Sequence, residues 1–331
     1  MLKRFILSLL CCSIFIPQTF AVTFKIATLS PDGSFWMNAM REGADKIKKN
    51  TQGRVKFKFY PGGVMGDDDS VMRKIRIRQL QGGAITTGTI STFYSDAQVY
   101  GLPMLFQSLD EVSYVRKRID PIILKNIEKK GFVTFGLAEG GFAYLMSLKE
   151  VKTVEDLRKY KTWVPASDKL VQEAVSAYDV QPVPLSMGDV LTGLQTGLID
   201  TVASPPIVTL ALHWHTQIKY LTDMPLLYST ALLIIDIKSF NKVSKDDQKI
   251  VREIMGDVFH KIDTQNRIDN VNALSALRKQ NITFLMPDEK QLAEWKSYAL
   301  KTQQHLVNTD YISKDLLDKV QSLINDYRKL K

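Results

Sequence analysis

Few side chains in this sequence are spaced for catalysis. Beyond residue 21 there is no cysteine, and two of the four histidines, His213 and His215, flank a tryptophan. Alternate residues share a face only on a strand, and no carboxylate or third histidine joins this pair at metal-ligand spacing. Neither the G-x-S-x-G elbow nor a phosphate-binding P-loop occurs. We therefore expect no enzyme activity, no metal site and no cofactor, and we interpret the two histidines as partly exposed neighbours of a packed tryptophan.

Three consecutive aspartates, Asp67, Asp68 and Asp69, form the densest group of carboxylates. Paired carboxylates are the residues of general acid–base catalysis. These three, however, open an amphipathic segment over 67–80, and the dipole of a helix favours negative charge in its first turn. We interpret them as the solvated start of a helix.

Aromatic and hydroxyl side chains, in contrast, lie at predicted strand ends or in the loops after them. Ligands of α/β proteins bind at the carboxyl ends of strands, between apolar walls that carry a few polar groups. For most single aromatic residues, packing in the core is the alternative. Trp163 is the exception, because it follows polar residues at a strand end. The predicted ligand-binding residues are Phe35, Trp36, Thr87, Tyr144, Trp163, Ser186, Ser204, Trp214 and Tyr228.

The order of the predicted elements indicates an α/β protein with parallel strands. Strands over 23–29, 55–60 and 84–89 alternate with helices over 34–49 and 67–80. The pattern then repeats, with helices over 168–177 and 187–197 among strands over 132–138, 142–146, 160–164, 182–185 and 201–203. Glycines 136, 140 and 141 mark a crossing between two lobes, and an apolar strand over 231–236 returns the chain to the first sheet.

A long helix is predicted over 244–279, where apolar residues recur at three-four spacing. Ser244 and Asp247 resemble a capping box at its start. At about 1.5 Å per residue this helix spans roughly 50 Å, enough to brace both lobes. Two further helices follow, over 288–308 and 313–329. We predict lobe I from residues 22–141 and 230–268, and lobe II from residues 142–229 and 269–331.

The N-terminus predicts export. Lys3 and Arg4 precede an apolar run over 5–16 and a small-residue cleavage site that ends at Ala21, as in a secretory signal peptide. An uncleaved anchor is the alternative, but the run is shorter than the about 20 residues of a membrane span, and Pro17 ends it. We expect cleavage after residue 21 and a periplasmic protein.

The charge does not indicate nucleic-acid binding. The formal net charge of +9 falls to +7 when Lys3 and Arg4 leave with the signal peptide. Basic residues are spread along the chain, and neither a zinc finger nor an RNA-binding signature is present. We interpret the charge as a dispersed solvated surface.

Several motifs together resemble the extracytoplasmic solute receptors of TRAP (tripartite ATP-independent periplasmic) transporters. Each motif is weak alone, but their order and spacing are specific. They are Phe-Lys-Phe-Tyr-Pro-Gly-Gly at 57–63 with Met-Gly at 65–66, Leu-Pro-Met-Leu-Phe at 102–106, Thr-Val-Glu-Asp-Leu at 153–157, Thr-Trp-Val-Pro at 162–165, Pro-Val-Pro-Leu-Ser at 182–186, and Gly-Leu-Gln-Thr-Gly-Leu-Ile-Asp at 193–200. The resemblance implies a two-lobed periplasmic-binding-protein fold, type II-like, with a ligand between the lobes.

The resemblance also implies ligand contacts that this sequence lacks. Trp163 stands where the family has an arginine that clamps a substrate carboxylate, Ala143 stands near a second arginine, and Ser204 falls near the usual asparagine. A tryptophan cannot form the planar fork of an arginine. A site rebuilt for an apolar, aromatic or cationic ligand is therefore expected, although Lys152, Lys161 or Lys169 could supply a relocated charge for an anion.

We expect a receptor that delivers a small organic ligand to a TRAP-type secondary transporter, with small and large integral membrane subunits as partners. A periplasmic carrier of a hydrophobic or lipid-like molecule, without a dedicated TRAP permease, is the alternative. We expect a monomer or a weak dimer, and no nucleic acid as partner.

Overall fold

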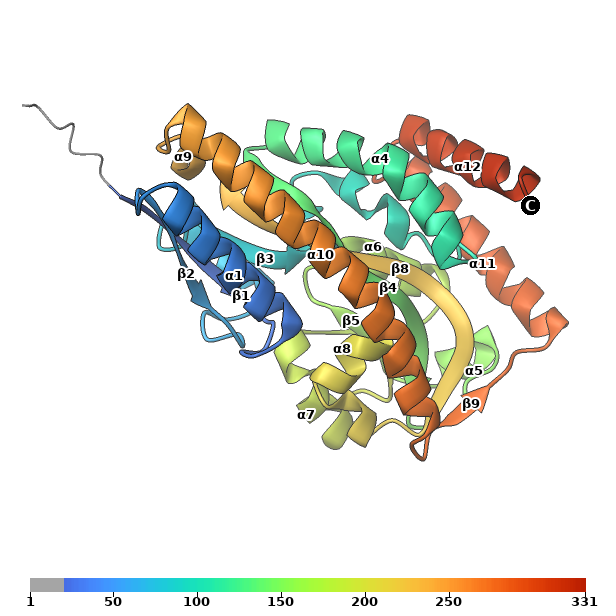
Figure 1. Ribbon diagram of the computed structural model, residues 1–331. Coiled ribbons are helices and arrows are strands. Elements are labelled where there is room, and N and C mark those ends of the chain that lie inside the picture. The colour runs from blue at the N-terminus through green and yellow to red at the C-terminus, as the bar shows by residue number, and fades with distance from the viewer. Residues whose placement is uncertain (1–20) are drawn as a thin grey trace, which may run out of the picture.

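The computed structural model describes residues 21–331, so the predicted signal peptide lies, apart from Ala21, outside the described residues. Nine strands form one mixed sheet in the order β2-β1-β3-β8-β4-β7-β5-β6, and β9 pairs with β8. Figure 1 shows helices on both faces of this sheet. The strands are β1 (Val22–Thr28), β2 (Val55–Tyr60), β3 (Gly82–Thr86), β4 (Phe132–Ser147), β5 (Thr162–Pro165), β6 (Pro182–Leu185), β7 (Thr201–Ser204), β8 (Tyr220–Asp236) and β9 (Thr283–Leu285).

Short and long helices alternate with these strands. The α-helices are α1 (Phe35–Asn50), α2 (Asp68–Arg76), α3 (Thr87–Ile90), α4 (Leu109–Lys129), α5 (Val154–Arg158), α6 (Lys169–Ala177), α7 (Val190–Gln195), α8 (Pro206–Ala211), α9 (Ile237–Phe240), α10 (Lys245–Arg278), α11 (Glu289–Asn308) and α12 (Lys314–Lys329). Three 3₁₀ turns complete them: η1 (Ser95–Gly101), η2 (Met187–Asp189) and η3 (Trp214–Thr216). None of the helices within residues 21–331 combines the length and apolar character needed to cross a membrane.

Two groups of parallel strands lie at the two ends of the sheet. The first sheet region comprises β2, β1 and β3, where β1 pairs in parallel with both neighbours. The second sheet region comprises β7, β5 and β6, where β5 is parallel to both neighbours. The predicted parallel strands are thus confirmed, and each region has an apolar core on either face.

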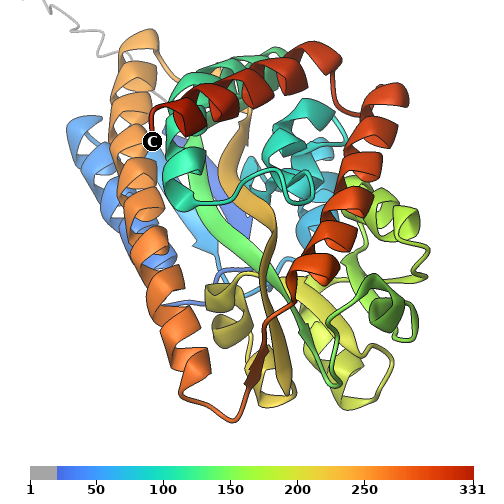
Figure 2. The same cartoon turned by 90° about the vertical axis from the view of Figure 1, so that its right-hand side faces the viewer.

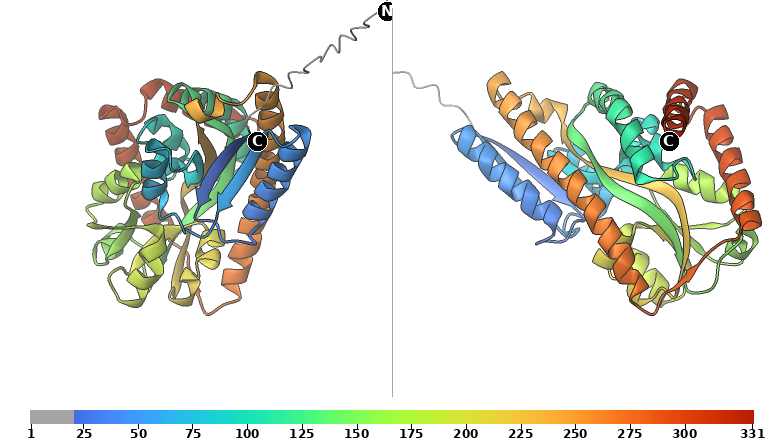
Figure 3. Two further views of the ribbon diagram at one scale, coloured as in Figure 1. Left: turned by 90° about the vertical axis from the view of Figure 1, so that its left-hand side faces the viewer. Right: turned by 45° about the vertical axis from the view of Figure 1, so that its right-hand side comes forward.

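The prediction of separate strands at 132–138 and 142–146 was wrong, because both belong to the single strand β4. The predicted strand at 231–236 does return the chain to the first sheet region, where it pairs with β3, but it is the end of the longer strand β8. The two long antiparallel strands β4 and β8 connect the sheet regions (Figure 3). The β4–β8 register shifts near Gly136 and Gly141, which have φ of 151° and 98°. Glycine adopts these angles without strain, so the strand bends but continues.

Helix α10 spans both sheet regions, as the sequence predicts. It packs on α1 beside the first region, on β4 in the middle and on α8 beside the second (Figure 1). Ser244 accepts a hydrogen bond from the backbone N–H of Asp247 (3.2 Å) at its start. The predicted capping box is incomplete, because the Asp247 carboxylate instead accepts two hydrogen bonds from Arg54, at 2.8 and 2.9 Å.

The last two helices lie on different parts of the protein. Helix α11 packs on α6, and Trp295 donates a hydrogen bond to the Lys152 carbonyl (2.9 Å) in the core of the second region. Helix α12 then crosses to α4 (Figure 2). The lobe boundaries stay a prediction, and the position of α12 places the end of the chain beside a helix of predicted lobe I.

The packing of β3 predicts a large effect of Gly82→Ala. A Cβ at Gly82 would lie 2.1 Å from the backbone oxygen of Ile234 and 2.8 Å from Cδ1 of Ile26. Because a backbone atom must move, we expect the unfolding free energy to fall by about 2 kcal/mol or more. Gly256→Ala in α10 is the control, since its Cβ would meet only the Phe135 oxygen at 3.9 Å. The unfolding free energy of that variant should rise by up to about 1 kcal/mol. Urea unfolding measures both, and equal stability of the two variants would contradict the β3 packing.

Candidate functional site

A cavity of about 210 Å³ lies between the two sheet regions, at the carboxyl ends of β3, β5, β6 and β7. Parallel strands present their following loops at one edge, which is where ligands of α/β proteins bind. The walls are mainly apolar. Six of the nine predicted ligand-binding residues line the cavity: Thr87, Trp163, Ser186, Ser204, Trp214 and Tyr228.

Two tryptophans form the wall from the second sheet region. Trp163 on β5 is only 4% exposed, and its ring packs edge-on against Trp214 with the centroids 5.2 Å apart. The Trp163 indole N–H donates to the backbone oxygen of Leu185 at 3.1 Å. Because its only hydrogen-bond donor is bound to Leu185, Trp163 contributes apolar surface to the cavity wall. The same hydrogen bond connects β5 to the end of β6.

Trp214 reaches this wall from a turn rather than a strand. His213 precedes it with φ of 59°, and Trp214 begins η3 with its side chain buried. His213 is exposed, and His215 is half-buried with Nδ1 3.3 Å from the Thr209 carbonyl. The prediction of histidines beside a packed tryptophan is confirmed. Within residues 21–331, no three His, Cys, Asp or Glu side chains converge as metal ligands.

Hydroxyl groups contribute to the wall at three further positions. Thr87 donates to the backbone oxygen of Thr230 at 3.1 Å. Ser186 donates to Asp189 at 2.7 Å, and Ser204 lies 3.3 Å from the Pro205 carbonyl. Each hydroxyl therefore has a partner within the protein and helps to fix a loop that borders the cavity.

Tyr228 on β8 carries the rear wall and is held from behind by ionised side chains. Tyr228 is among the lining residues, and its ring packs edge-on against Phe106 and Phe142. Its hydroxyl accepts from Arg116 on α4 (3.1 Å) and donates to Glu139 on β4 (2.9 Å). Burial raises the pKa of Tyr228 far above its usual range, so the hydroxyl stays protonated.

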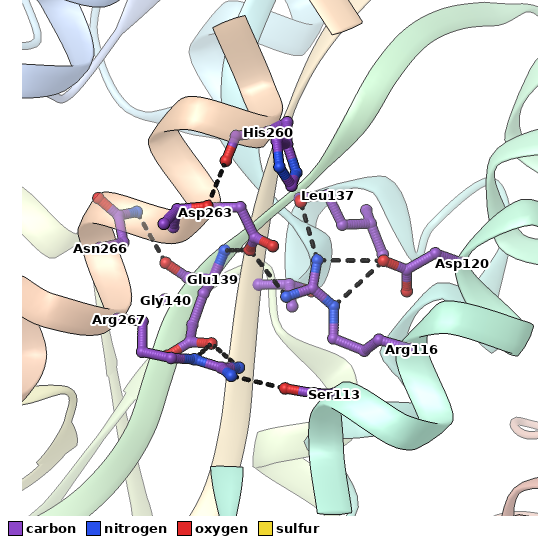
Figure 4. Close-up of polar contacts among 12 residues, drawn as sticks. Ser113, Arg116, Asp120, Leu137, Glu139, Gly140, His260, Asp263, Asn266 and Arg267 are labelled. Carbon is purple, nitrogen blue, oxygen red and sulfur yellow. Dashed lines mark hydrogen bonds and ion pairs between the residues drawn. The ribbon is translucent and has the colours of Figure 1, made fainter. Parts of the chain in front are cut away.

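Figure 4 shows the ionic network behind this wall, in which α4 and α10 meet across β4. Arg116 contacts Asp263 at 2.8 Å, Asp120 at 3.0 Å and the Leu137 carbonyl at 2.9 Å. Glu139 is 1% exposed and accepts from Arg267 at 2.5 Å. Buried charges need such partners, because removal from water otherwise costs several kcal/mol per ion. The network therefore fixes the middle of β4 between its two helices.

Four carboxylates in the cavity wall were not predicted as site residues, and two of them, Asp68 and Asp168, are held by hydrogen bonds from neighbouring elements. Asp67 caps α2 by accepting from the Ser70 N–H at 2.8 Å, as a helix start should. Asp68, however, is 9% exposed and accepts from the Thr86 N–H and the Thr89 hydroxyl, both at 3.0 Å. The interpretation of a solvated run was wrong for Asp68, because the start of α2 packs against the end of β3. Burial raises its pKa, and the hydrogen bonds oppose this effect.

Asp168 is the second carboxylate, and it connects the two sides of the cavity. It caps α6 by accepting from the Val171 N–H at 3.0 Å, and it also accepts from Gln98 of η1 at 2.7 Å. Gly88 lies so close that a Cβ there would be 2.4 Å from Oδ2 of Asp168. Burial raises the pKa of Asp168, and the Gln98 amide opposes the rise. The sequence indicated only a helix near 168–177; nothing in it indicated this approach.

Three predicted residues lie outside the cavity lining. Trp36 donates to Asn266 of α10 at 3.0 Å and packs on Phe259. Phe35 packs on the core between α1 and α10. Tyr144 packs on two cores at the centre of the sheet. The first turn of α1 therefore directs its two aromatic residues towards α10.

No arginine, lysine or histidine of residues 21–331 lines the cavity, whereas Asp67, Asp68, Asp69 and Asp168 do. The proposed relocated lysines are placed elsewhere. Lys161 donates to the Gly197 carbonyl at 2.6 Å, Lys169 lies over the Tyr311 ring at 5.7 Å, and Lys152 does not line the cavity.

Known proteins share both sequence and fold with this chain. Residues 26–309 match the profile of DctP, the bacterial extracellular solute-binding protein family 7. The sialic acid-binding periplasmic protein SiaP of Vibrio cholerae is 20% identical over 279 residues, 83% of this chain and 86% of that protein.

Two solved structures have the same fold. A TRAP periplasmic solute-binding protein of Sulfurospirillum deleyianum with bound succinate superposes with a TM-score of 0.83 at 20% identity, over 92% of this chain and 99% of that one. A TRAP periplasmic solute-binding protein of Xanthobacter autotrophicus with bound β-D-galacturonate gives a TM-score of 0.82 at 19% identity, over 91% and 99%.

The close approach at Gly88 predicts that Gly88→Ala weakens ligand binding. The added methyl group would displace the Asp168 carboxylate and break its hydrogen bond to Gln98. We expect about tenfold weaker binding of the copurified ligand, from the loss of about 1.4 kcal/mol. Calorimetry measures the affinity. Gly101→Ala is the matched control, because its Cβ would meet nothing closer than 3.9 Å in the same wall. Equal affinity of both variants would contradict the prediction.

The network behind Tyr228 predicts that Tyr228→Phe affects stability more than binding. The variant keeps the ring and its packing but leaves Arg116 and Glu139 each without one hydrogen bond. We expect the unfolding free energy to fall by about 1–3 kcal/mol and the ligand affinity to stay within about twofold. Chemical unfolding and calorimetry measure these quantities.

Tyr298→Phe is the control for this variant, since the Tyr298 hydroxyl accepts from Arg158 at the exposed surface (2.7 Å). Its stability should stay close to that of the wild type. A Tyr228→Phe variant as stable as Tyr298→Phe would show that the network does not depend on the hydroxyl.

Proposed function

Because this chain belongs to the bacterial extracellular solute-binding proteins of family 7, a family of transport receptors rather than enzymes, we propose that it is the receptor of a TRAP-type secondary transporter with a rebuilt ligand site. Its signal peptide, residues 1–21, would direct it to the periplasm. A small and a large integral membrane subunit would receive the ligand. The receptor would act as a monomer or weak dimer, closing lobe I on lobe II around the ligand.

The composition of the cavity wall is the observation that carries this proposal. Trp163 and Trp214 supply aromatic surface, and the residues of 21–331 supply no basic side chain to the wall. We propose that the ligand is apolar, aromatic or cationic, and that it contacts Thr87, Trp163, Ser186, Ser204, Trp214 and Tyr228. We also propose that Trp163 replaces the carboxylate-clamping arginine of other members of the family.

The relatives named above bind acids: sialic acid, succinate and galacturonate. A carboxylate in this cavity would lie near Asp68 and Asp168 without a basic partner in the wall. Like charges repel more strongly where water is excluded, so an acid of this kind would bind poorly. The expected ligand therefore differs in charge from the ligands of these relatives.

A periplasmic carrier of a hydrophobic or lipid-like molecule remains the second candidate, favoured by the apolar walls. Such a carrier would share the pocket but would not need a TRAP permease. Deletion of the genes for the two membrane subunits distinguishes the candidates. Loss of uptake of the copurified ligand supports the receptor, and undiminished uptake supports the carrier.

Truncation of the aromatic wall tests the site. Trp163→Ala should weaken binding of the copurified ligand about thirtyfold, since a buried aromatic contact at a binding hot spot is worth about 2 kcal/mol or more. Trp163→Arg should abolish binding of that ligand without creating tight carboxylate binding, because Asp68 and Asp168 stay in the wall. Calorimetry with the copurified ligand and a panel of small carboxylates measures both effects, and thermal melting confirms folding.

Tight binding of simple dicarboxylates by the wild type, unaffected by Trp163→Ala, would overturn the rebuilt site. The family assignment would stand in that case.

A further inference from the structure

We infer that the ligand carries an ammonium group and that Asp168 and Asp68 are its counter-ions. This inference rests on the proposed function, because it places the ligand in the same cavity. It goes further by naming the ligand's charge and the two side chains that recognise it.

Asp168 has one carboxylate oxygen occupied and one free. Oδ1 accepts from the Gln98 amide at 2.7 Å and from the Val171 N–H at 3.0 Å. Oδ2 receives neither of these two hydrogen bonds and lies against Gly88 in the cavity wall. The two protein donors hold the carboxylate still, so the free oxygen has a fixed position from which to accept a bond.

Asp68 has a similar arrangement at the start of α3. Its Oδ2 accepts from the Thr86 N–H and the Thr89 hydroxyl, both at 3.0 Å, and lies 3.3 Å from the Thr86 hydroxyl. Its Oδ1 has no donor in the described part of the chain, although the side chain is only 9% exposed and lines the cavity. Neither Oδ1 of Asp68 nor Oδ2 of Asp168 is among the fully buried polar atoms of residues 21–331 that lack a partner. Both oxygens therefore face solvent in the cavity, where a donor group of a ligand can displace water and bind them.

The surroundings of both carboxylates exclude a protein cation as this donor. Lys169 follows Asp168 in sequence but lies over the Tyr311 ring, and Arg73 of α2 donates to the Ser70 hydroxyl at 2.7 Å. Neither lines the cavity, and Asp67 and Asp69 add further negative charge to the wall. The electrostatic potential inside therefore favours a positive ligand.

The aromatic wall restricts this positive ligand to an organic cation. The indole N–H of Trp163 is occupied by the Leu185 carbonyl, so the ring offers only its π surface and edge. Such a surface packs against an apolar body or against an alkylated ammonium group. No three carboxylate, histidine or cysteine ligands meet within residues 21–331, as a bare metal ion would require. The arrangement fits a small amine or quaternary ammonium with an apolar body.

The test compares probes that share a skeleton and differ in charge. The first set is phenethylamine, 2-phenylethanol and 3-phenylpropionate, and the second is butanediamine, butanediol and adipate, with choline as the quaternary probe. Binding to the protein freed of ligand is measured by calorimetry, and the ligand released from protein purified out of its periplasm is sorted by ion exchange. We expect an amine to bind tightest in at least one set, and the released ligand to be held by a cation exchanger.

Charge-removing variants assign the effect to the two aspartates. Asp168→Asn and Asp68→Asn should each weaken the tightest-binding cationic probe about thirtyfold, as expected for a lost charge-assisted contact. The affinity for the neutral probe of the same skeleton should change less than threefold. Asp257→Asn, on the exposed side of α10, is the matched control. It should change the affinity for neither the cationic nor the neutral probe. Melting temperatures verify that each variant is folded, and the neutral probe distinguishes loss of charge from loss of shape.

The outcomes separate this inference from the proposed function. Tighter binding of a carboxylate or an alcohol than of every cationic probe, or a released ligand that is anionic or neutral, overturns the inference and leaves the receptor standing. Full amine affinity in both aspartate variants also overturns it. If no probe of any charge binds and no ligand is released, both the inference and the solute-receptor proposal fail.

Discussion

The antiparallel pairing of β4 with β8 is the constraint on which the rest of this structure depends. In the strand order of the described chain, β8 and β4 lie between the first sheet region and the second and join them. Their pairing therefore sets how the two regions face each other. It also places Tyr228 at the rear of the cavity and Glu139 opposite α10. The site is therefore built around two strands that supply few of its polar groups.

Local pattern in the sequence predicted the parallel strands and most of the long helices, but neither helix α4 nor the continuity of β4 and β8. The apolar stripe of α10 repeats over many turns, so its extent was clear. Glycine usually interrupts a ladder, and the prediction therefore divided β4 at residues 139–141. The ladder continues because partner strands and α10 accommodate Gly136 and Gly141 at positive φ. Such support comes from residues far away in sequence.

The site, too, depends on contacts between residues that are far apart in sequence, which local pattern does not predict. Strand ends predicted six residues of the cavity wall, because a parallel sheet brings those ends together. They did not predict Asp68 or Asp168, since both look like ordinary helix starts and owe their burial to β3, α3 and η1. The carboxylates behind Tyr228 are neutralised by Arg116 and Arg267, whereas those in the cavity have no such partner in the wall. The fold thus pairs the first set of carboxylates with arginines, whereas the second set faces the cavity.

The path of α10 has a thermodynamic consequence for the whole chain. A helix of 34 residues that packs on α1, β4 and α8 cannot lose its contacts in one region and keep its turns in the other without exposing a broken apolar stripe. Strands β4 and β8 share their backbone hydrogen bonds between both regions in the same way. Melting of either region therefore removes the scaffold of the other, and the two behave as one cooperative unit. Backbone amides at the centre of β4 would exchange with solvent only when the entire molecule unfolds.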